Sequence, residues 1–207
     1  MINKQISKKK ITPLKKDEKI LVVKRSDFFL EKPWQGLKEV NFEKYLQQIQ
    51  EKKEFLWRSE MELDPSYKQI IPYLIFEHEN NYFLMQRRSK ASETRLANKY
   101  TFGIGGHIRE EDIQGETLFD WAKREFHEEV NYNGNLQIKP LGIINDDSTQ
   151  VGKVHVGFVL LLKGNSDKIS IKSELKNGQL LSLNTCKQYY NCMESWSKII
   201  FDNLTII

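Results

Sequence analysis

Residues 124–130 read REFHEEV and carry three glutamates within seven positions. Glu128 and Glu129 follow Glu125 by three and four positions, so on a helix the three carboxylates converge on one edge. The simplest interpretation is a solvated helix face, because glutamate favours helices and water. Converging like charges repel one another, however, which is a poor way to stabilise a helix. A site for a hard divalent cation explains the same pattern, because Mg²⁺ prefers carboxylate oxygens.

The surrounding sequence predicts that this stretch is the end of an amphipathic helix covering about residues 117–130. Thr117 and Asp120 have the spacing of a reciprocal capping pair at the helix start. Apolar side chains then recur near the helical period and form the expected buried stripe. These side chains are Leu118, Phe119, Ala122, Phe126 and Val130.

Ahead of this helix, a predicted strand at 100–106 ends in glycines, with residues 103–106 reading GIGG. Glycine allows a tight turn and lets a bare backbone approach a neighbouring element. Taken alone, the glycines indicate only an ordinary strand-to-loop turn.

Together, the glycines, the acids and the arginine resemble the signature of the Nudix hydrolase family. Glu116 precedes Arg124 by seven intervening residues, and residues 124–130 fit the second half of that signature position by position. Nine residues separate Gly106 from Glu116, where the family pattern has five, which is similar to a longer-box subgroup of predicted phosphoesterases. Asn131 replaces the final glycine, and we expect it to adopt the left-handed conformation that ends helices.

The resemblance implies a bound Mg²⁺ or Mn²⁺ ion. Glu125 and Glu129 would be its principal ligands, Glu128 a further ligand or a general base, and the carbonyl of Gly105 would complete the shell. Arg124 would pair with Glu116 and orient the carboxylates of the helix.

Other positions are candidates by their location in the chain. Family members often recruit a further glutamate from a loop outside the signature, and Glu174 is the candidate here, with Asp146 and Asp147 behind it. An ordinary loop acid is the alternative for each. The substrate phosphates would be bound by Arg87, Arg88 and His107, with Arg95 and His155 as further candidates.

Aromatic side chains could stack a base, although core packing is their usual role. The candidates are Trp34, Trp57, Tyr73 and Phe102.

The remaining pattern predicts an α/β (α+β) fold, a Nudix-like α/β/α sandwich with a mixed sheet. Residues 1–18 form a basic tail, 19–65 an N-terminal extension packed on the core, and 66–207 the Nudix domain. We expect a loop between residues 25 and 41. Strands are expected at 19–25, 69–78, 81–88, 100–106, 138–145, 153–163, near 170 and at 180–183, with helices at 41–53, 117–130 and 185–203.

Composition narrows the class of protein. The net charge of +4 comes from six lysines in residues 1–16, and the rest of the chain carries 26 basic against 28 acidic side chains.

Because no apolar stretch follows the basic N-terminus, a secretory signal is not expected, and the longest apolar run, 154–162, is too short to span a bilayer. Two cysteines six positions apart form no disulfide framework. We expect a cytoplasmic protein with no membrane association.

The function expected from the resemblance is divalent-metal-dependent hydrolysis of a pyrophosphate bond in a small nucleoside diphosphate derivative. One alternative is a Nudix-fold sensor that binds a nucleotide without turnover. Another is an RNA-end-processing enzyme that uses the lysine-rich arm, although nucleic acid is the less favoured partner. An isoprenoid diphosphate isomerase also belongs to the wider superfamily, but no cysteine lies near the acids to favour it. The oligomeric state stays open, with a homodimer as one alternative.

Overall fold

A mixed sheet forms the centre of the molecule in the computed structural model, which describes residues 17–88, 98–112, 117–172 and 175–205. The sheet order is β12–β5–β4–β10–β9–β2, and β4 and β10 pair in parallel at its middle. The strands are β1 (Lys19–Lys24), β2 (Gly36–Lys38), β3 (Glu54–Trp57), β4 (Tyr67–His78), β5 (Asn81–Arg87), β6 (Tyr100–Thr101), β7 (Gly103–Ile104), β8 (Val130–Tyr132), β9 (Leu136–Asn145), β10 (His155–Gly164), β11 (Ile169–Ile171) and β12 (Leu175–Ser182).

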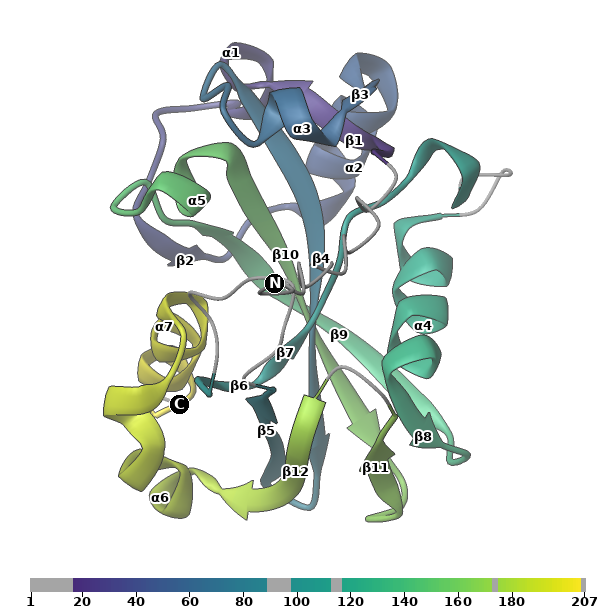
Figure 1. The fold of residues 1–207 in the computed structure, drawn as a ribbon, viewed down its shortest axis with the longest axis vertical. Helices are drawn as coiled ribbons and strands as arrows, with labels where there is room; N and C mark the ends of the chain where they lie inside the picture. The colour runs from purple at the N-terminus through teal and green to yellow at the C-terminus, as the bar shows by residue number, and fades with distance from the viewer. Residues whose placement is uncertain (1–16, 89–97, 113–116, 173–174, 206–207) are drawn as a thin grey trace, which may run out of the picture.

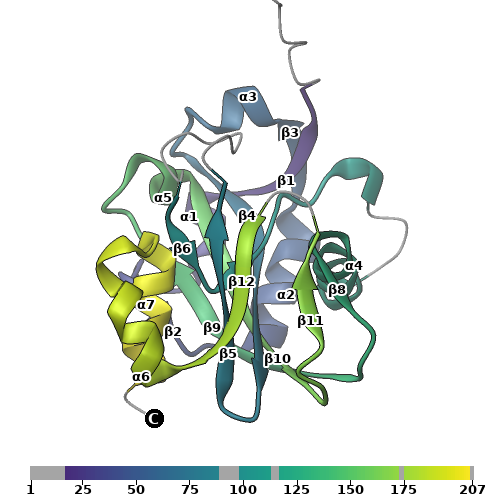
Figure 2. The same cartoon turned by 60° about the horizontal axis from the view of Figure 1, so that its bottom comes forward.

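Helices cover both faces of this sheet (Figures 1 and 2). Leu74 and Phe76 of β4 face one apolar cluster, which includes residues of α2 and α4, whereas Tyr73 and Ile75 face a second cluster with α6 and α7. The predicted α/β/α sandwich with a mixed sheet is therefore confirmed. The helices are α1 (Arg25–Phe28), α2 (Phe42–Lys52), α3 (Arg58–Met61), α4 (Leu118–Glu129), α5 (Gln150–Val154), α6 (Leu183–Cys186) and α7 (Ser195–Leu204), with short 3₁₀ helices η2 (Glu110–Asp112) and η3 (Lys187–Cys192).

The β4–β5 hairpin forms where the sequence predicts it. Glu79 and Asn80 at its tip have φ of 48° and 61°, the left-handed values that a tight two-residue hairpin requires. The predicted helix caps are also present. The Asn41 side chain accepts from Lys44 N, and Thr117 and Asp120 form a complete capping box.

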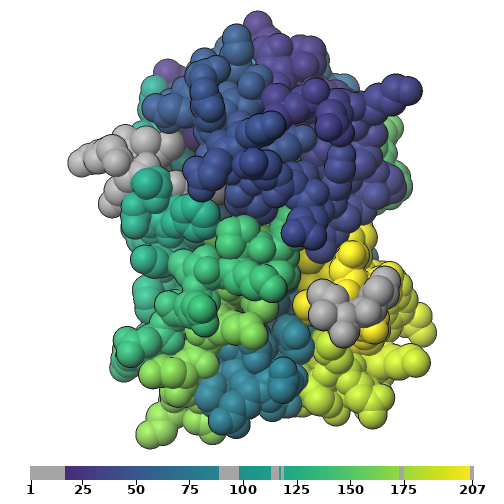
Figure 3. Space-filling model, turned by 180° about the vertical axis from the view of Figure 1, so that it is seen from behind, coloured from purple at the N-terminus to yellow at the C-terminus, as the bar shows by residue number. Residues whose placement is uncertain are grey.

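The segment 19–65 contributes strands to the same sheet system as the rest of the chain. β1 pairs with β4, and β2 pairs with β9. Figure 3 shows this segment, in purple and blue, covering the upper part of the rear face. The division of the chain at residue 65 stays a prediction.

An ion-paired lysine ties the start of β4 to the segment that leads into β10. Lys68 is fully buried, and its Nζ donates to Asp147 Oδ1 at 3.0 Å, to Gly152 O at 2.8 Å and to His155 O at 3.3 Å. Arg25 also donates to both oxygens of Asp147, at 2.9 and 2.6 Å. Burial lowers the pKa of Lys68 to about 8, although the bond to Asp147 opposes this shift.

Three expectations about local structure are wrong. Asn131 is not a left-handed cap, because α4 ends at an extended Val130 and passes directly into β8, which pairs with β11. The last helix is broken into α6, η3 and α7, since Met193 and Glu194 are extended. The expected loop at 25–41 contains α1 and the edge strand β2, whose pairing with β9 is a tertiary contact.

None of the helices within the described residues is long and apolar enough to cross a lipid bilayer.

Candidate active site

A cavity of about 720 Å³ lies beside the C-terminal half of α4. The loop after β7, the start of β10 and the start of α7 also contribute to its walls. Figure 1 shows where these elements lie in the fold. Glu18, immediately before β1, and Arg58 of α3 also line it. Residues far apart in the chain thus meet around one polar space. The charged and histidine side chains that line it are Glu18, Arg58, Arg87, Lys99, His107, Arg109, Glu125, Glu128, Glu129, His155 and Glu194.

The three predicted carboxylates share one wall of this cavity. Glu125 is half-buried, and burial together with the charges of Glu128 and Glu129 raises its pKa to about 7. Glu128 is more open to solvent, with 55% of its side chain exposed. The inner face of the same helix is packed against the sheet through Trp121, Ala122 and Phe126. Trp121 is a core residue that was not in the expected apolar stripe.

The glycines after β7 bring the backbone against the sheet and the acidic helix. A Cβ atom at Gly106 would stand 2.6 Å from Glu125 Oε1, and one at Gly105 would stand 2.4 Å from the carbonyl oxygen of Pro72. Both glycines line the cavity, so the predicted metal-shell residue Gly105 lies with the acids.

Arg124 is held by acids on two sides. Its Nη2 lies 3.5 Å from Asp112 Oδ1, and its Nε lies 3.8 Å from Glu128 Oε1. Its expected partner Glu116 lies outside the described residues. Asp112 is nearly buried and also accepts from both Nε and Nη2 of Arg109, at 2.8 and 2.9 Å. Although burial raises it, these bonds hold the pKa of Asp112 below its ordinary value.

Arg109 and Asp112 were not among the expected site residues. Their only signal in the sequence is an Arg–Asp pair three positions apart within the inserted stretch 107–115.

Arg87 reaches the cavity wall opposite the acidic helix. Its Nε donates to Glu194 Oε1 at 2.5 Å, and Glu194 is 7% exposed at the start of α7. Nothing in the sequence points to Glu194. Arg88, the neighbouring candidate, is exposed, donates to the carbonyl oxygen of Leu175 at 2.8 Å, and is not among the residues that line the cavity.

The two histidine candidates contact each other. His107 Nε2 lies 3.2 Å from His155 Nε2 and 2.7 Å from Gln69 Oε1. His155 is buried and its Nδ1 donates to the carbonyl oxygen of Val151 at 2.7 Å. Both rings line the cavity.

The loop acids divide into two groups. Asp147 belongs to the Lys68 ion pair, and Asp146 accepts from Gln35 Nε2 and Ser148. These two acids stabilise the turn after β9 and do not line the cavity. Glu174, like Arg95, lies outside the described residues.

Of the aromatic candidates, only Tyr73 lines the cavity, and its hydroxyl is engaged with Thr101 and Ser197. Trp196 also lines the cavity and stands edge-on to Tyr73, with ring centroids 5.4 Å apart. The other three aromatic candidates are not among the residues that line the cavity: Trp34, Trp57 and Phe102.

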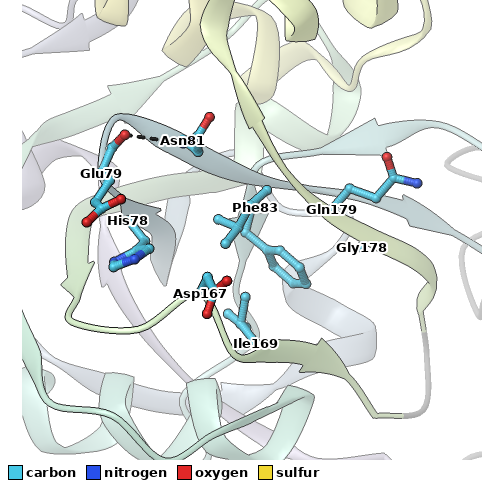
Figure 4. A pocket seen from close by; sticks show the side chains of 9 residues that line it. His78, Glu79, Asn81, Phe83, Asp167, Ile169, Gly178 and Gln179 are labelled. Carbon is cyan, nitrogen blue, oxygen red and sulfur yellow. Dashed lines mark hydrogen bonds between the residues drawn. The ribbon is translucent and has the colours of Figure 1, made fainter.

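A smaller hollow of about 420 Å³ lies near the tip of the β4–β5 hairpin (Figure 4). His78 and Asp167 line it beside the apolar Phe83 and Ile169. His78 Nδ1 is bonded to the carbonyl oxygen of Gly164 at 2.9 Å. None of the predicted site residues is among its lining side chains.

This α/β/α sandwich, in which three glutamates of one helix and a glycine-rich strand end line one cavity, has the arrangement that the Nudix resemblance predicts. Comparison with known proteins identifies the family. The chain is 34% identical over 206 residues to Protein YmaB of Bacillus subtilis (strain 168), covering 92% of this chain and 98% of that protein. It is also 34% identical to Tm1382, a Nudix protein of known crystal structure, with a TM-score of 0.75, covering 90% of this chain and 98% of that one.

The Nudix domain of Shewanella oneidensis NrtR, solved with ADP ribose, shares the fold at 13% identity and a TM-score of 0.50, covering 68% and 89% of the two chains. No family model matches the chain. The chain belongs to the Nudix hydrolase family and is a Nudix phosphohydrolase.

Proposed function

We propose that this protein hydrolyses a pyrophosphate bond in a nucleoside diphosphate derivative, using Mg²⁺ or Mn²⁺ held by Glu125, Glu128 and Glu129. The observation that carries this proposal is the convergence of the three carboxylates on one wall of a cavity large enough for a small nucleotide.

The donor set fits a hard divalent cation. Burial, together with the charges of Glu128 and Glu129, raises the pKa of Glu125 to about 7, so a positive charge among the three carboxylates would offset both effects. Mg²⁺ and Mn²⁺ favour such oxygen ligands and retain water or substrate phosphate in their remaining positions. The carbonyl of Gly105 is the proposed backbone ligand, because the strand end that carries it lies beside the same helix.

When bound, the ion supplies charge neutralisation for the pyrophosphate and activation of the attacking water. The surrounding residues position the acids. Arg124 links Glu128 to the nearly buried Asp112, and Arg109 anchors Asp112 from the other side. We assign Glu128 to accept a proton from the attacking water, because its carboxylate is the more solvent-exposed. Glu174 keeps its proposed role as a further catalytic glutamate from outside the signature.

The opposite wall is suited to the phosphates and the remainder of the substrate. Arg87 is oriented by the carboxylate of Glu194 and presents a guanidinium group, which binds phosphate oxygens bidentately. His107 is a second phosphate contact from the loop after β7. Trp196 offers the aromatic surface of the cavity for a base. Arg88 is not among the residues that line the cavity, so its proposed phosphate contact applies only to a substrate long enough to extend beyond the cavity.

The test is turnover of a substrate panel with Mg²⁺ or Mn²⁺, beside a Glu129→Gln control. The panel contains nucleoside triphosphates, nucleotide sugars, dinucleoside polyphosphates, ADP-ribose and capped RNA. ADP-ribose is included because the NrtR Nudix domain was solved with it. Metal-dependent release of phosphate, pyrophosphate or a nucleoside monophosphate that disappears in the control supports the proposal and names the substrate class. If the protein binds a nucleotide but hydrolyses none of the compounds in the panel, the proposed hydrolysis is wrong and the protein is a nucleotide sensor.

A further inference from the structure

A second set of metal-ligand atoms involves none of the three glutamates of α4, and two of its three residues, His107 and His155, line the same cavity. Glu62, His107 and His155 each offer one ligand atom, and these atoms all lie within 4.8 Å of one another. Glu62 follows α3, His107 follows β7, and His155 begins β10. The three residues are so far apart in the chain that no sequence motif joins them.

The spacing of the histidine nitrogens is that of two ligands on one ion. Zinc–nitrogen bonds are about 2.0–2.1 Å long, so two imidazole nitrogens at a tetrahedral angle stand about 3.3 Å apart. His107 Nε2 and His155 Nε2 are 3.2 Å apart. An ion could therefore bridge the two rings with little movement of either.

The protonation of His155 also suits a ligand. Its Nδ1 lies 2.7 Å from the carbonyl oxygen of Val151, and because a carbonyl can only accept, Nδ1 carries the proton. In the neutral ring the Nε2 lone pair then faces His107. Donation from the remote nitrogen to a backbone carbonyl is the arrangement that orients metal-binding histidines. Lys68 reinforces it, because its buried Nζ holds the carbonyl oxygens of Gly152 and His155.

The other two members are held by contacts that a cation could replace. His107 Nε2 lies 2.7 Å from Gln69 Oε1, and Gln69 Nε2 donates to Met61 O at 3.1 Å. Because an amide oxygen can only accept, His107 Nε2 carries the proton of this bond. An ion at His107 Nε2 would take the place of the bond to Gln69, and the proton would move to Nδ1 of the ring through solvent. Glu62 Oε1 lies 3.4 Å from Arg58 Nε, a long contact, while the stronger bond of Arg58 is to Glu18 at 2.9 Å. Glu62 can therefore turn toward the rings without leaving Arg58 unpaired.

We propose that Glu62, His107 and His155 form a second cation site that selects a divalent transition ion of the Zn²⁺ class. Imidazole ligands favour such ions, whereas Mg²⁺ favours the all-oxygen set on α4. Three protein ligands leave a coordination position open, as in sites where a zinc ion contacts water or substrate. Because His107 and His155 line the cavity, that open position would face the substrate space. This proposal concerns ion binding and does not depend on the hydrolysis proposed above.

The experiment titrates chelator-stripped full-length protein with Co²⁺, whose visible absorption reports nitrogen ligation, and with Zn²⁺ by calorimetry. We expect one equivalent of Co²⁺ to give an intense visible band that excess Mg²⁺ does not remove. Glu62→Gln and His107→Gln should each weaken this binding about tenfold or more. Glu60→Gln is the matched control, because Glu60 is exposed on α3, two positions before Glu62, and lies outside the cluster.

Glu129→Gln separates this site from the acidic helix and should keep the cobalt band. Circular dichroism of each variant checks that the fold is retained. Absence of a band in the wild type would overturn the proposal. So would equal affinities in the Glu62→Gln and Glu60→Gln proteins, or a band that is lost in Glu129→Gln and kept in His107→Gln.

Discussion

Gly106 lies directly against the carboxylate of Glu125, since a Cβ atom at residue 106 would stand 2.6 Å from Glu125 Oε1. This contact joins the strand end after β7 to the acidic helix α4. The contact explains why glycine suits position 106, because any side chain there would push the Glu125 carboxylate away from those of Glu128 and Glu129.

We expect Gly106→Ala to weaken Mn²⁺ binding about tenfold while the protein still folds. Gly106 does not have a positive φ, so alanine causes no backbone strain, and the atom it meets is the end of a flexible side chain. Calorimetric titration of Mn²⁺ measures the effect, and the melting temperature of the metal-free variant serves as the control. Wild-type Mn²⁺ affinity in this variant would mean that Glu125 is not a ligand.

Glu129→Gln should reduce kcat about 10²-fold on whichever substrate the panel identifies, because it removes a ligand charge from the ion. The matched control is Glu43→Gln, which makes the same change in charge at an exposed position of α2. Steady-state kinetics at saturating Mg²⁺ compare the two variants. Equal rates in both would show that the three acids are only a solvated helix face.

The metal-free protein should lose stability as pH rises from about 5 to about 8. The pKa of Glu125 is raised from 4.5 to about 7, so in this window the folded state binds more protons than the unfolded state. When the folded state holds the extra proton, the free energy of unfolding falls as pH rises, and the loss is complete above the folded pKa.

Glu125→Gln should flatten this pH dependence and raise the melting temperature at pH 8. The measurement is thermal unfolding in EDTA across the pH range, with Glu43→Gln as the control that keeps the wild-type slope. If the melting temperature of Glu125→Gln changes with pH as much as that of the wild type, the raised pKa of Glu125 is contradicted.

Asp147→Asn should lower the free energy of unfolding by about 3 kcal/mol, because it leaves the buried ammonium of Lys68 without its counter-charge. Asp147 also accepts from Arg25, so the same change loosens the N-terminal segment. Urea denaturation measures the loss, and Asp167→Asn at an exposed loop position is the control. If the double variant Lys68→Met/Asp147→Asn is no more stable than Asp147→Asn alone, the unpaired lysine is not the cause.

Local chemistry made several elements predictable. The capping box at Thr117, the Asn41 cap and the Glu79–Asn80 turn each depend on residues close together in the chain, and all three form as expected. Asn131 shows the limit of such reasoning. Its place at the final glycine of the signature suggested a left-handed cap, but pairing of β8 with β11 holds it in a strand, because a tertiary ladder outweighs a local preference.

The sequence by itself determined the family, the sandwich and the acidic helix, because these depend on short-range spacing and on hydrophobic period. Only the tertiary structure decided which other groups lie in and around the cavity with the acids. Glu194 meets Arg87 and Glu62 meets the two histidines across long stretches of chain, and Asp112 of η2 meets Arg124 of α4. Such meetings follow from how β4, β10 and the N-terminal segment pack together. Side chains distant in sequence become neighbours only when burial of the apolar faces brings their strands and helices together.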